Sequence, residues 1–84
     1  MLVQVTDVQV LEGYRLRLSF SDGELGDIDL ESELWGEVFE PLRDPALFRQ
    51  VRVDPELGTV VWPNGADLDP EGLRAGVRRV ERAR

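Results

Sequence analysis

Five aspartates stand at spacings that could carry acid–base or metal chemistry: Asp22, Asp27, Asp29, Asp67 and Asp69. A calcium-binding loop needs an Asp-x-Asp-x-Asp-Gly series followed by a bidentate Glu, and the sequence has no such run. Structural roles explain several of these residues, because Asp22 precedes a glycine in a turn and Asp69 precedes a proline at a helix start. The sequence therefore predicts no metal site.

Catalytic side chains are scarce. The sequence has no His, no Lys and no Cys, so proton transfer would depend on Asp, Glu and the single tyrosine, Tyr14. No serine has an activating base beside it, and neither a glycine-rich phosphate loop nor a dinucleotide-binding fingerprint is present. We predict a protein that is not an enzyme and that needs no cofactor.

The block Trp62-Pro63-Asn64-Gly65-Ala66-Asp67 has two interpretations. In the structural one, the Pro-Asn-Gly run forms a turn, Trp62 anchors the core, and Asp67 accepts backbone N–H groups. In the functional one, Trp62, Asn64 and Asp67 line a shallow partner-binding surface, since tryptophan is enriched at interfaces. The sequence alone leaves both open.

Charge is distributed unevenly along the chain. The net charge is −7, with −11 over residues 1–71 and +4 over residues 72–84. Arg74, Arg78 and Arg82 recur every four residues and would form a basic face on a C-terminal helix. That face is either simply solvated or contacts an acidic partner or nucleic-acid phosphates; the acidic remainder would repel nucleic acid.

Length and hydropathy indicate the class of protein. The 84 residues, 42% of them hydrophobic, are enough for a single domain spanning residues 1–84. Apolar runs are only three or four residues long, which predicts neither a transmembrane segment nor a signal peptide. Without cysteine there is no disulfide framework, and we expect a cytoplasmic protein.

Alternating residues predict a three-stranded meander at the N-terminus. Residues 14–20 and 24–30 form its second hairpin, where a three-residue loop, 21–23, fixes the register. It pairs Leu16 with Ile28, Tyr14 with Leu30, Arg17 with Asp27 and Arg15 with Asp29. The first hairpin has the loop 11–13, and a β-bulge near Thr6-Asp7 keeps its apolar residues on the core face. Its predicted pairs are Val10 with Tyr14, Val8 with Leu16, Val5 with Leu18 and Val3 with Phe20.

The rest of the chain mixes short helices with a further hairpin. Asp44-Pro45 predicts a short helix over 45–50, and Asp69-Pro70 predicts a helix over about 70–82. That last helix would carry an apolar stripe of Leu73, Val77 and Val80. Between the helices, a hairpin sets Val53 opposite Val60 and Val51 opposite Trp62. We predict an α+β fold in two layers, β-β-β-α-β-β-α, with one five-stranded sheet covered on one face by helices.

These elements carry a resemblance that spans about residues 3–73. The motifs are Phe20-Ser-Asp-Gly23, Phe39 with Pro41-Leu42, Phe48, Val53-Asp54 and, most specifically, the Trp62–Asp67 block with Leu68 after it. They are similar to the domain of unknown function 2442 family of small bacterial proteins. The resemblance implies the fold of the N-terminal domain of a two-domain bacterial regulator whose second domain is a helix-turn-helix. This sequence ends at Arg84 without space for that second domain, which weighs against sequence-specific DNA binding.

The function predicted is a non-enzymatic protein-interaction module. The resemblance adds an accessory or antitoxin-like role in a small bacterial regulatory system, with another small bacterial protein or a second copy as partner. The alternative is weak nucleic-acid binding or regulation through the arginines of the C-terminal helix.

Overall fold

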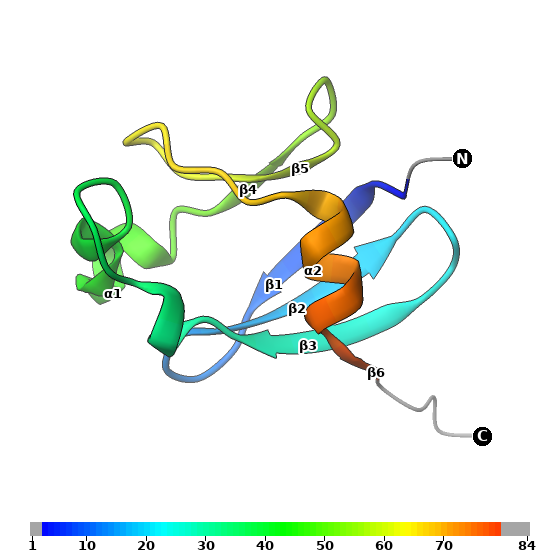
Figure 1. The fold of residues 1–84 in the computed structure, drawn as a ribbon, viewed down its shortest axis with the longest axis horizontal. Coiled ribbons are helices and arrows are strands. Elements are labelled where there is room, and N and C mark those ends of the chain that lie inside the picture. The colour runs from blue at the N-terminus through cyan, green and yellow to red at the C-terminus, as the bar shows by residue number, and fades with distance from the viewer. Residues whose placement is uncertain (1–2, 80–84) are drawn as a thin grey trace.

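The computed structural model describes residues 3–79, which form two antiparallel sheets and several short helices (Figure 1). The elements are β1 (Val5–Val10), β2 (Arg15–Phe20), β3 (Leu25–Asp29), the 3-10 helices η1 (Glu31–Glu33) and η2 (Glu40–Arg43), α1 (Pro45–Phe48), β4 (Arg52–Asp54), β5 (Thr59–Val61), α2 (Pro70–Gly76) and β6 (Arg78–Arg79). The predicted α+β fold, with a meander, a second hairpin and a C-terminal helix, is confirmed.

The second hairpin has the predicted register. Leu16 pairs with Ile28 and Arg17 with Asp27, and the loop closes through hydrogen bonds between Phe20 and residues 23 and 24. Gly23 has a φ of 87°, a left-handed conformation that residues with a Cβ adopt only at a cost. This glycine therefore sets the length of the loop, and with it the face on which each apolar residue lies.

The first hairpin is shifted by two residues from the prediction. Val10 pairs with Leu16 and Val8 with Leu18, so the loop is 12–14. Tyr14 lies in this loop; its hydroxyl donates to the Arg43 carbonyl, and its own carbonyl accepts the Leu30 N–H. The predicted bulge is confirmed between residues 5 and 7, although Val5 pairs with Phe20 rather than lying near Leu18.

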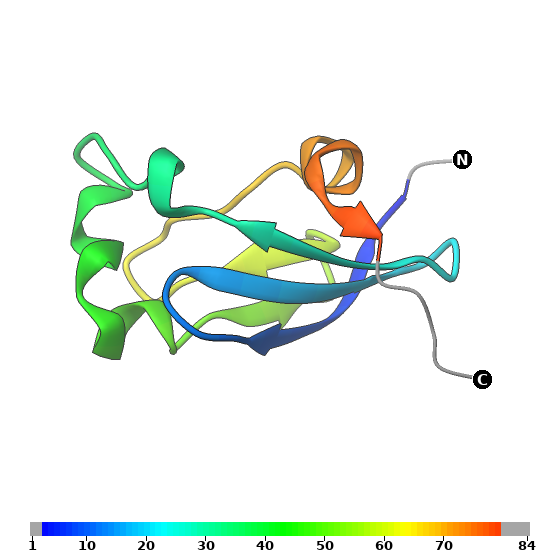
Figure 2. The ribbon, with the colours of Figure 1, turned by 90° about the horizontal axis from the view of Figure 1, so that it is seen from below.

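The predicted five-stranded sheet is wrong, because β4 and β5 form a sheet of their own. Their pairing of Val53 with Val60 is as predicted, but β4 begins at Arg52, after Val51. Thr59 and the residues up to Trp62 are all buried, so β5 packs across the inner face of the larger sheet instead of extending its edge. Figure 2 shows β1, β2 and β3 in front of this hairpin.

The core lies between the larger sheet, the β4–β5 hairpin and the helices. Its buried side chains include Leu16, Leu18, Leu34, Leu42, Phe48, Val60, Trp62 and Leu73. Phe48 is central, because its ring lies 5.3 Å from that of Tyr14 and 5.9 Å from that of Trp62. Aromatic contacts of this kind stabilise a small core beyond the area that they bury.

Both helix starts are as predicted. The Asp44 carboxylate accepts the Ala46 N–H at the start of α1, and the Asp69 carboxylate accepts the Gly72 N–H at the start of α2. Such caps satisfy N–H groups that have no partner within the helix. α1 is shorter than the predicted 45–50 and ends at Phe48.

The predicted helix over 70–82 is wrong beyond Gly76. Val77 is extended, with ψ of 149°, and β6 follows, pairing with β3. Gly26 of β3 permits this pairing, because a Cβ at that position would lie 2.6 Å from the Val77 side chain. Close packing against β3 therefore replaces further helical turns; Val80 and Arg82 lie outside the described residues.

Candidate partner-binding groove

Trp62 is a core residue. Its side chain is 3% exposed, and its indole N–H donates to the Phe48 carbonyl at 2.9 Å. The structural interpretation of this tryptophan therefore holds, and burial removes Trp62 from the predicted partner-binding surface.

The other two residues of that predicted surface differ from each other. Asn64 is exposed, but its side-chain amide donates to the Val38 carbonyl at 2.9 Å and its side-chain oxygen accepts the Ala66 N–H at 3.2 Å. Asp67 is exposed, and its side chain makes no hydrogen bond within residues 3–79, so it lacks the backbone bonds predicted for it. The turn thus uses Asn64 to hold the segment around Val38.

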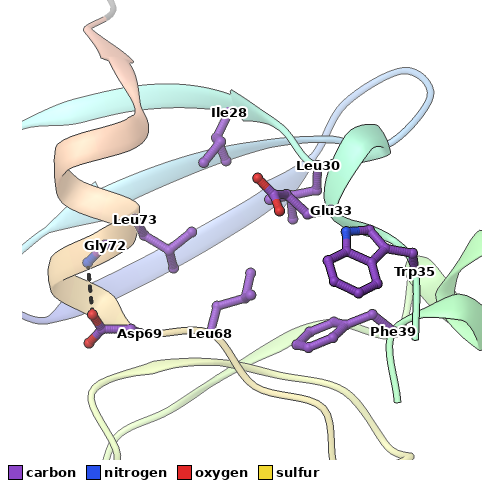
Figure 3. A pocket seen from close by; sticks show the side chains of 9 residues that line it. All are labelled: Ile28, Leu30, Glu33, Trp35, Phe39, Leu68, Asp69, Gly72 and Leu73. Atoms are coloured by element: carbon purple, nitrogen blue, oxygen red, sulfur yellow. Dashed lines mark hydrogen bonds between the residues drawn. The ribbon is translucent and has the colours of Figure 1, made fainter. Parts of the chain in front are cut away.

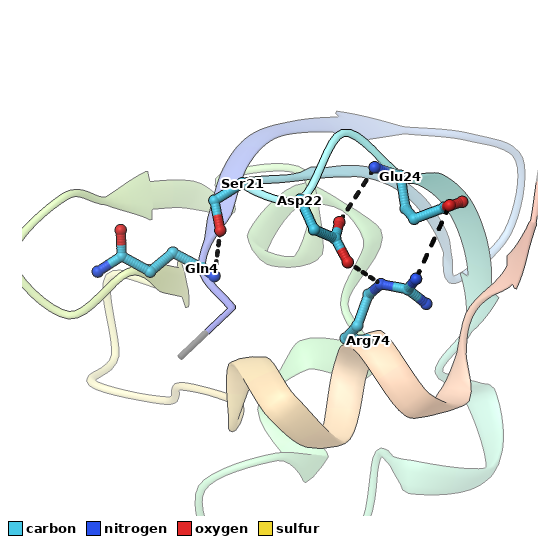
Figure 4. A network of polar contacts seen from close by, with 5 residues as sticks. All are labelled: Gln4, Ser21, Asp22, Glu24 and Arg74. Carbon is cyan, nitrogen blue, oxygen red and sulfur yellow. Dashed lines mark hydrogen bonds and ion pairs between the residues drawn. The ribbon is translucent and has the colours of Figure 1, made fainter. Parts of the chain in front are cut away.

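Arg74 of the predicted basic face is engaged within the molecule (Figure 4). Its Nε lies 2.8 Å from the Asp22 carboxylate, and its guanidinium lies over the Phe20 ring at 5.7 Å. Glu24 adds a more distant ion pair at 4.0 Å. Arg74 therefore attaches α2 to the β2–β3 hairpin.

The predicted basic face is not continuous. Arg78 lies in β6, where it pairs with Asp27 of β3, and not one helical turn beyond Arg74. Arg82 lies outside the described residues.

Arginines shift the titration of the neighbouring carboxylates. The hydrogen bond from Arg74 lowers the pKa of Asp22, and the hydrogen bond from Arg17 lowers the pKa of Asp27. The Asp27 hydrogen bond in turn raises the pKa of Arg17. Arg15 lies 3.6 Å from Asp27 rather than forming an ion pair with Asp29, its partner in the strand register. These carboxylates act as structural ion-pair partners in this arrangement.

Residues 3–79 contain neither a cluster of metal ligands nor a membrane-spanning helix. No three His, Cys, Asp or Glu side chains come together in a way that could hold a metal ion. No helix in this part of the chain is both long and apolar enough to cross a bilayer.

An apolar groove of about 450 Å³ lies between β3, α2 and the segment after η1 (Figure 3). We call it the Trp35 groove. Its lining residues are Ile28, Leu30, Glu33, Trp35, Phe39, Leu68, Asp69, Gly72 and Leu73. Trp35 is 70% exposed, although tryptophan buries more apolar area than most residues when it is covered. The groove therefore combines an aliphatic floor with an aromatic wall that is open to solvent.

The segment that carries the aromatic wall is held in place from both sides. The Arg43 Nε donates to the Leu34 carbonyl at 2.7 Å, and the Asn64 amide donates to the Val38 carbonyl. Leu34 is itself buried and anchors the segment in the core. Trp35 thus projects from a backbone that is fixed before any ligand arrives, which lowers the entropic cost of binding.

The sequence interpretation missed this groove. Leu34 and Trp35 are adjacent in sequence, yet Leu34 is buried in the core and Trp35 points outward. The available signal was the pair of large apolar neighbours followed directly by Gly36.

The comparison with family models decides where this chain belongs. The model for DUF2442, a protein of unknown function, matches residues 5–79. The chain belongs to the DUF2442 family. The resemblance inferred from the Trp62–Asp67 block is thereby confirmed, and the match spans both sheets and the whole Trp35 groove. No curated protein matches this DUF2442 chain.

A solved structure is similar to this DUF2442 protein. It is the crystal structure of a "Putative DNA Binding Protein", NE0471, from Nitrosomonas europaea ATCC 19718. The two chains are 31% identical with a TM-score of 0.67, over 75% of this chain and 41% of the NE0471 chain. The DUF2442 chain thus matches less than half of the length of NE0471.

Proposed function

We propose that this protein is a non-enzymatic interaction module that binds another protein through the Trp35 groove. The observation that carries the proposal is the 70% exposure of Trp35 beside an apolar groove whose backbone is already fixed. Exposed tryptophans over apolar hollows are typical of the energetic centres of protein interfaces. Covering the indole removes apolar area from water, which is the main favourable term in association.

Charge indicates the kind of partner. The protein carries a net charge of −7, and the groove is lined by Glu33 and Asp69 but by no basic residue. Opposite charge speeds encounter and fixes orientation, so a basic protein fits this surface. We propose that the module acts in the bacterial cytoplasm as an accessory or antitoxin-like component. In this role it binds the surface of a basic partner protein.

Affinity capture with matched variants tests this proposal. The immobilised protein should retain a partner that is lost with Trp35→Ser but kept with Leu57→Ser, which removes another exposed apolar side chain, 55% exposed, away from the groove. The retained protein is then purified and the complex rebuilt from two components. Loss of a central aromatic side chain weakens an interface by about 2 kcal/mol or more, roughly 30-fold in Kd. Equal binding by the two variants contradicts the proposal.

A second candidate is weak nucleic-acid binding. NE0471 is named for DNA binding, and Arg15 and Arg49 line a second hollow in this chain, near the β1–β2 loop, beside Arg17, which is hydrogen-bonded to Asp27. Of the arginines first assigned to this role, Arg74 is occupied by Asp22. Binding of this kind should fall steeply with salt and weaken in Arg15→Ala and Arg49→Ala but not in Trp35→Ser. Binding that does not respond to salt contradicts it.

A further inference from the structure

We propose that the Trp35 groove recognises an arginine side chain of the partner, a proposal that rests on the proposed function and specifies the ligand. An arginine combines an aliphatic stem with a planar cation. The groove offers a complementary surface for each of these two parts.

The aliphatic part of the groove fits the stem. Leu30 and Leu73 are almost fully buried and form the floor of the groove. Leu68, in the segment before α2, lines the groove beside them (Figure 3). Long cationic side chains bury their methylene groups along such surfaces while the charged end stays near water.

The open side of the groove fits the cation. Figure 3 shows the rings of Trp35 and Phe39 on one wall, with the Glu33 carboxylate further along the groove, near Leu30. Guanidinium groups bind the faces of aromatic rings, tryptophan best, and they pair with carboxylates through two parallel hydrogen bonds. The Glu33 side chain makes no hydrogen bond or ion pair with any other residue that the structure describes.

Two arginines of the described chain that lie near the groove already have partners. Arg43, the arginine nearest in sequence to the aromatic wall, donates to the carbonyls of Leu34 and Glu31. Arg74 of α2 is paired with Asp22 on the β2–β3 hairpin. The acidic and aromatic groups of the groove therefore face solvent without a cation among the lining residues.

Three short capped peptides test the inference, with a central arginine, a central citrulline or a central leucine in an otherwise identical alanine sequence. Citrulline keeps the shape of arginine and removes the charge. The readout is the indole N–H signal of Trp35 in NMR spectra of labelled protein, and the indole of the buried Trp62 serves as an internal control. The arginine peptide should shift the Trp35 signal, leave that of Trp62 unchanged, and bind about fivefold more tightly than the citrulline peptide.

Matched variants assign the preference to named groups. Glu33→Gln should remove most of the arginine preference, and so should Trp35→Leu, whose affinities are measured by calorimetry because this variant lacks the Trp35 signal. Glu37→Gln, an exposed acidic neighbour that does not line the groove, should leave it unchanged. Equal affinity for arginine and citrulline peptides, or tighter binding of the leucine peptide, overturns the inference while leaving a partner-binding groove in place. No shift with any peptide at about 10 mM, where a millimolar complex would be largely formed, also overturns it. The proposed function is judged separately by the capture experiment.

Discussion

The two tryptophans of this chain lie in regions of opposite character. Trp62 is 3% exposed, donates its indole N–H to Phe48 and begins the most specific motif of the sequence. Trp35 is 70% exposed, stands in an irregular segment and belongs to no recognisable motif. In this chain a specific motif encodes a structural device, while the proposed binding surface lies where the sequence pattern is weakest.

The largest difference between the two regions should appear in stability. Trp62→Ala leaves a cavity beside Phe48 and is expected to lower the free energy of unfolding by about 3–5 kcal/mol. Trp35→Ala removes a mostly solvated side chain and should change it by less than about 0.5 kcal/mol. Denaturant unfolding measures both values. Similar losses for the two variants would contradict the assignment of one tryptophan to the core and the other to the surface.

The α2 wall of the groove can be disturbed without touching either tryptophan. In Gly26→Ala the new methyl group would lie 2.6 Å from the Val77 side chain, so the chain after α2 must move. Overpacking of this kind costs about 1–3 kcal/mol.

Gly76→Ala is the control for that variant, because its Cβ would lie 3.4 Å from the Ile28 side chain, close to ordinary contact. Thermal unfolding of both variants measures how much each substitution lowers the stability. A Gly26→Ala protein as stable as the wild type would show that α2 and β6 do not pack closely on β3.

Asn64 connects the two regions, since it stands in the Trp62 turn and binds the carbonyl of Val38 near the aromatic wall. Asn64→Ala loses one exposed and one partly buried hydrogen bond, so we expect the free energy of unfolding to fall by about 1 kcal/mol. It should also broaden the Trp35 indole signal in NMR spectra. Asp67 follows in the same segment, and its side chain makes no hydrogen bond to a described residue. Asp67→Ala should therefore change neither the free energy of unfolding nor the width of the Trp35 signal. Equal stability and equal Trp35 line widths in the two variants would contradict the positioning role of Asn64.

The smallest effect expected is on the pH dependence of stability. The folded pKa values of Asp22 and Asp27 are depressed by Arg74 and Arg17, so these ion pairs stabilise the protein above the unfolded pKa of about 3.9. That contribution is lost as the pH falls through the lower, folded pKa values.

Asp22→Asn should therefore flatten the acid limb of a stability-against-pH curve, and the flattening should be smaller at high salt. Glu37→Gln is a suitable control on an exposed carboxylate. An unchanged acid limb in Asp22→Asn would contradict the role of Arg74 in attaching α2.

The local part of the fold was predictable from the sequence. Alternation and Gly23 determine the β2–β3 register, and Asp44 and Asp69 mark both helix starts. The β1–β2 register was not predictable in this way, because a shift of two residues leaves the same side chains on the core face. The observed register is accompanied by a contact distant in sequence, between the Tyr14 hydroxyl and the Arg43 carbonyl.

The same limit applies to the C-terminal helix and to the candidate site. Local propensity favours a helix beyond Gly76, but pairing with β3 replaces it. The Trp35 groove joins residues of β3, the segment after η1 and α2, which only tertiary packing brings together. The burial of Trp62 and the turn after it were among the interpretations open at the sequence level; the outward orientation of Trp35 was not.

Fluorine NMR of the protein labelled with fluorotryptophan, titrated with the purified unlabelled partner from the capture experiment, tests the central claim most directly. The protein has two tryptophans and therefore gives two signals, one from each region. We predict that saturation with partner shifts the Trp35 signal and leaves the Trp62 signal in place. A partner that binds fully while the Trp35 signal stays at its free position would contradict the claim.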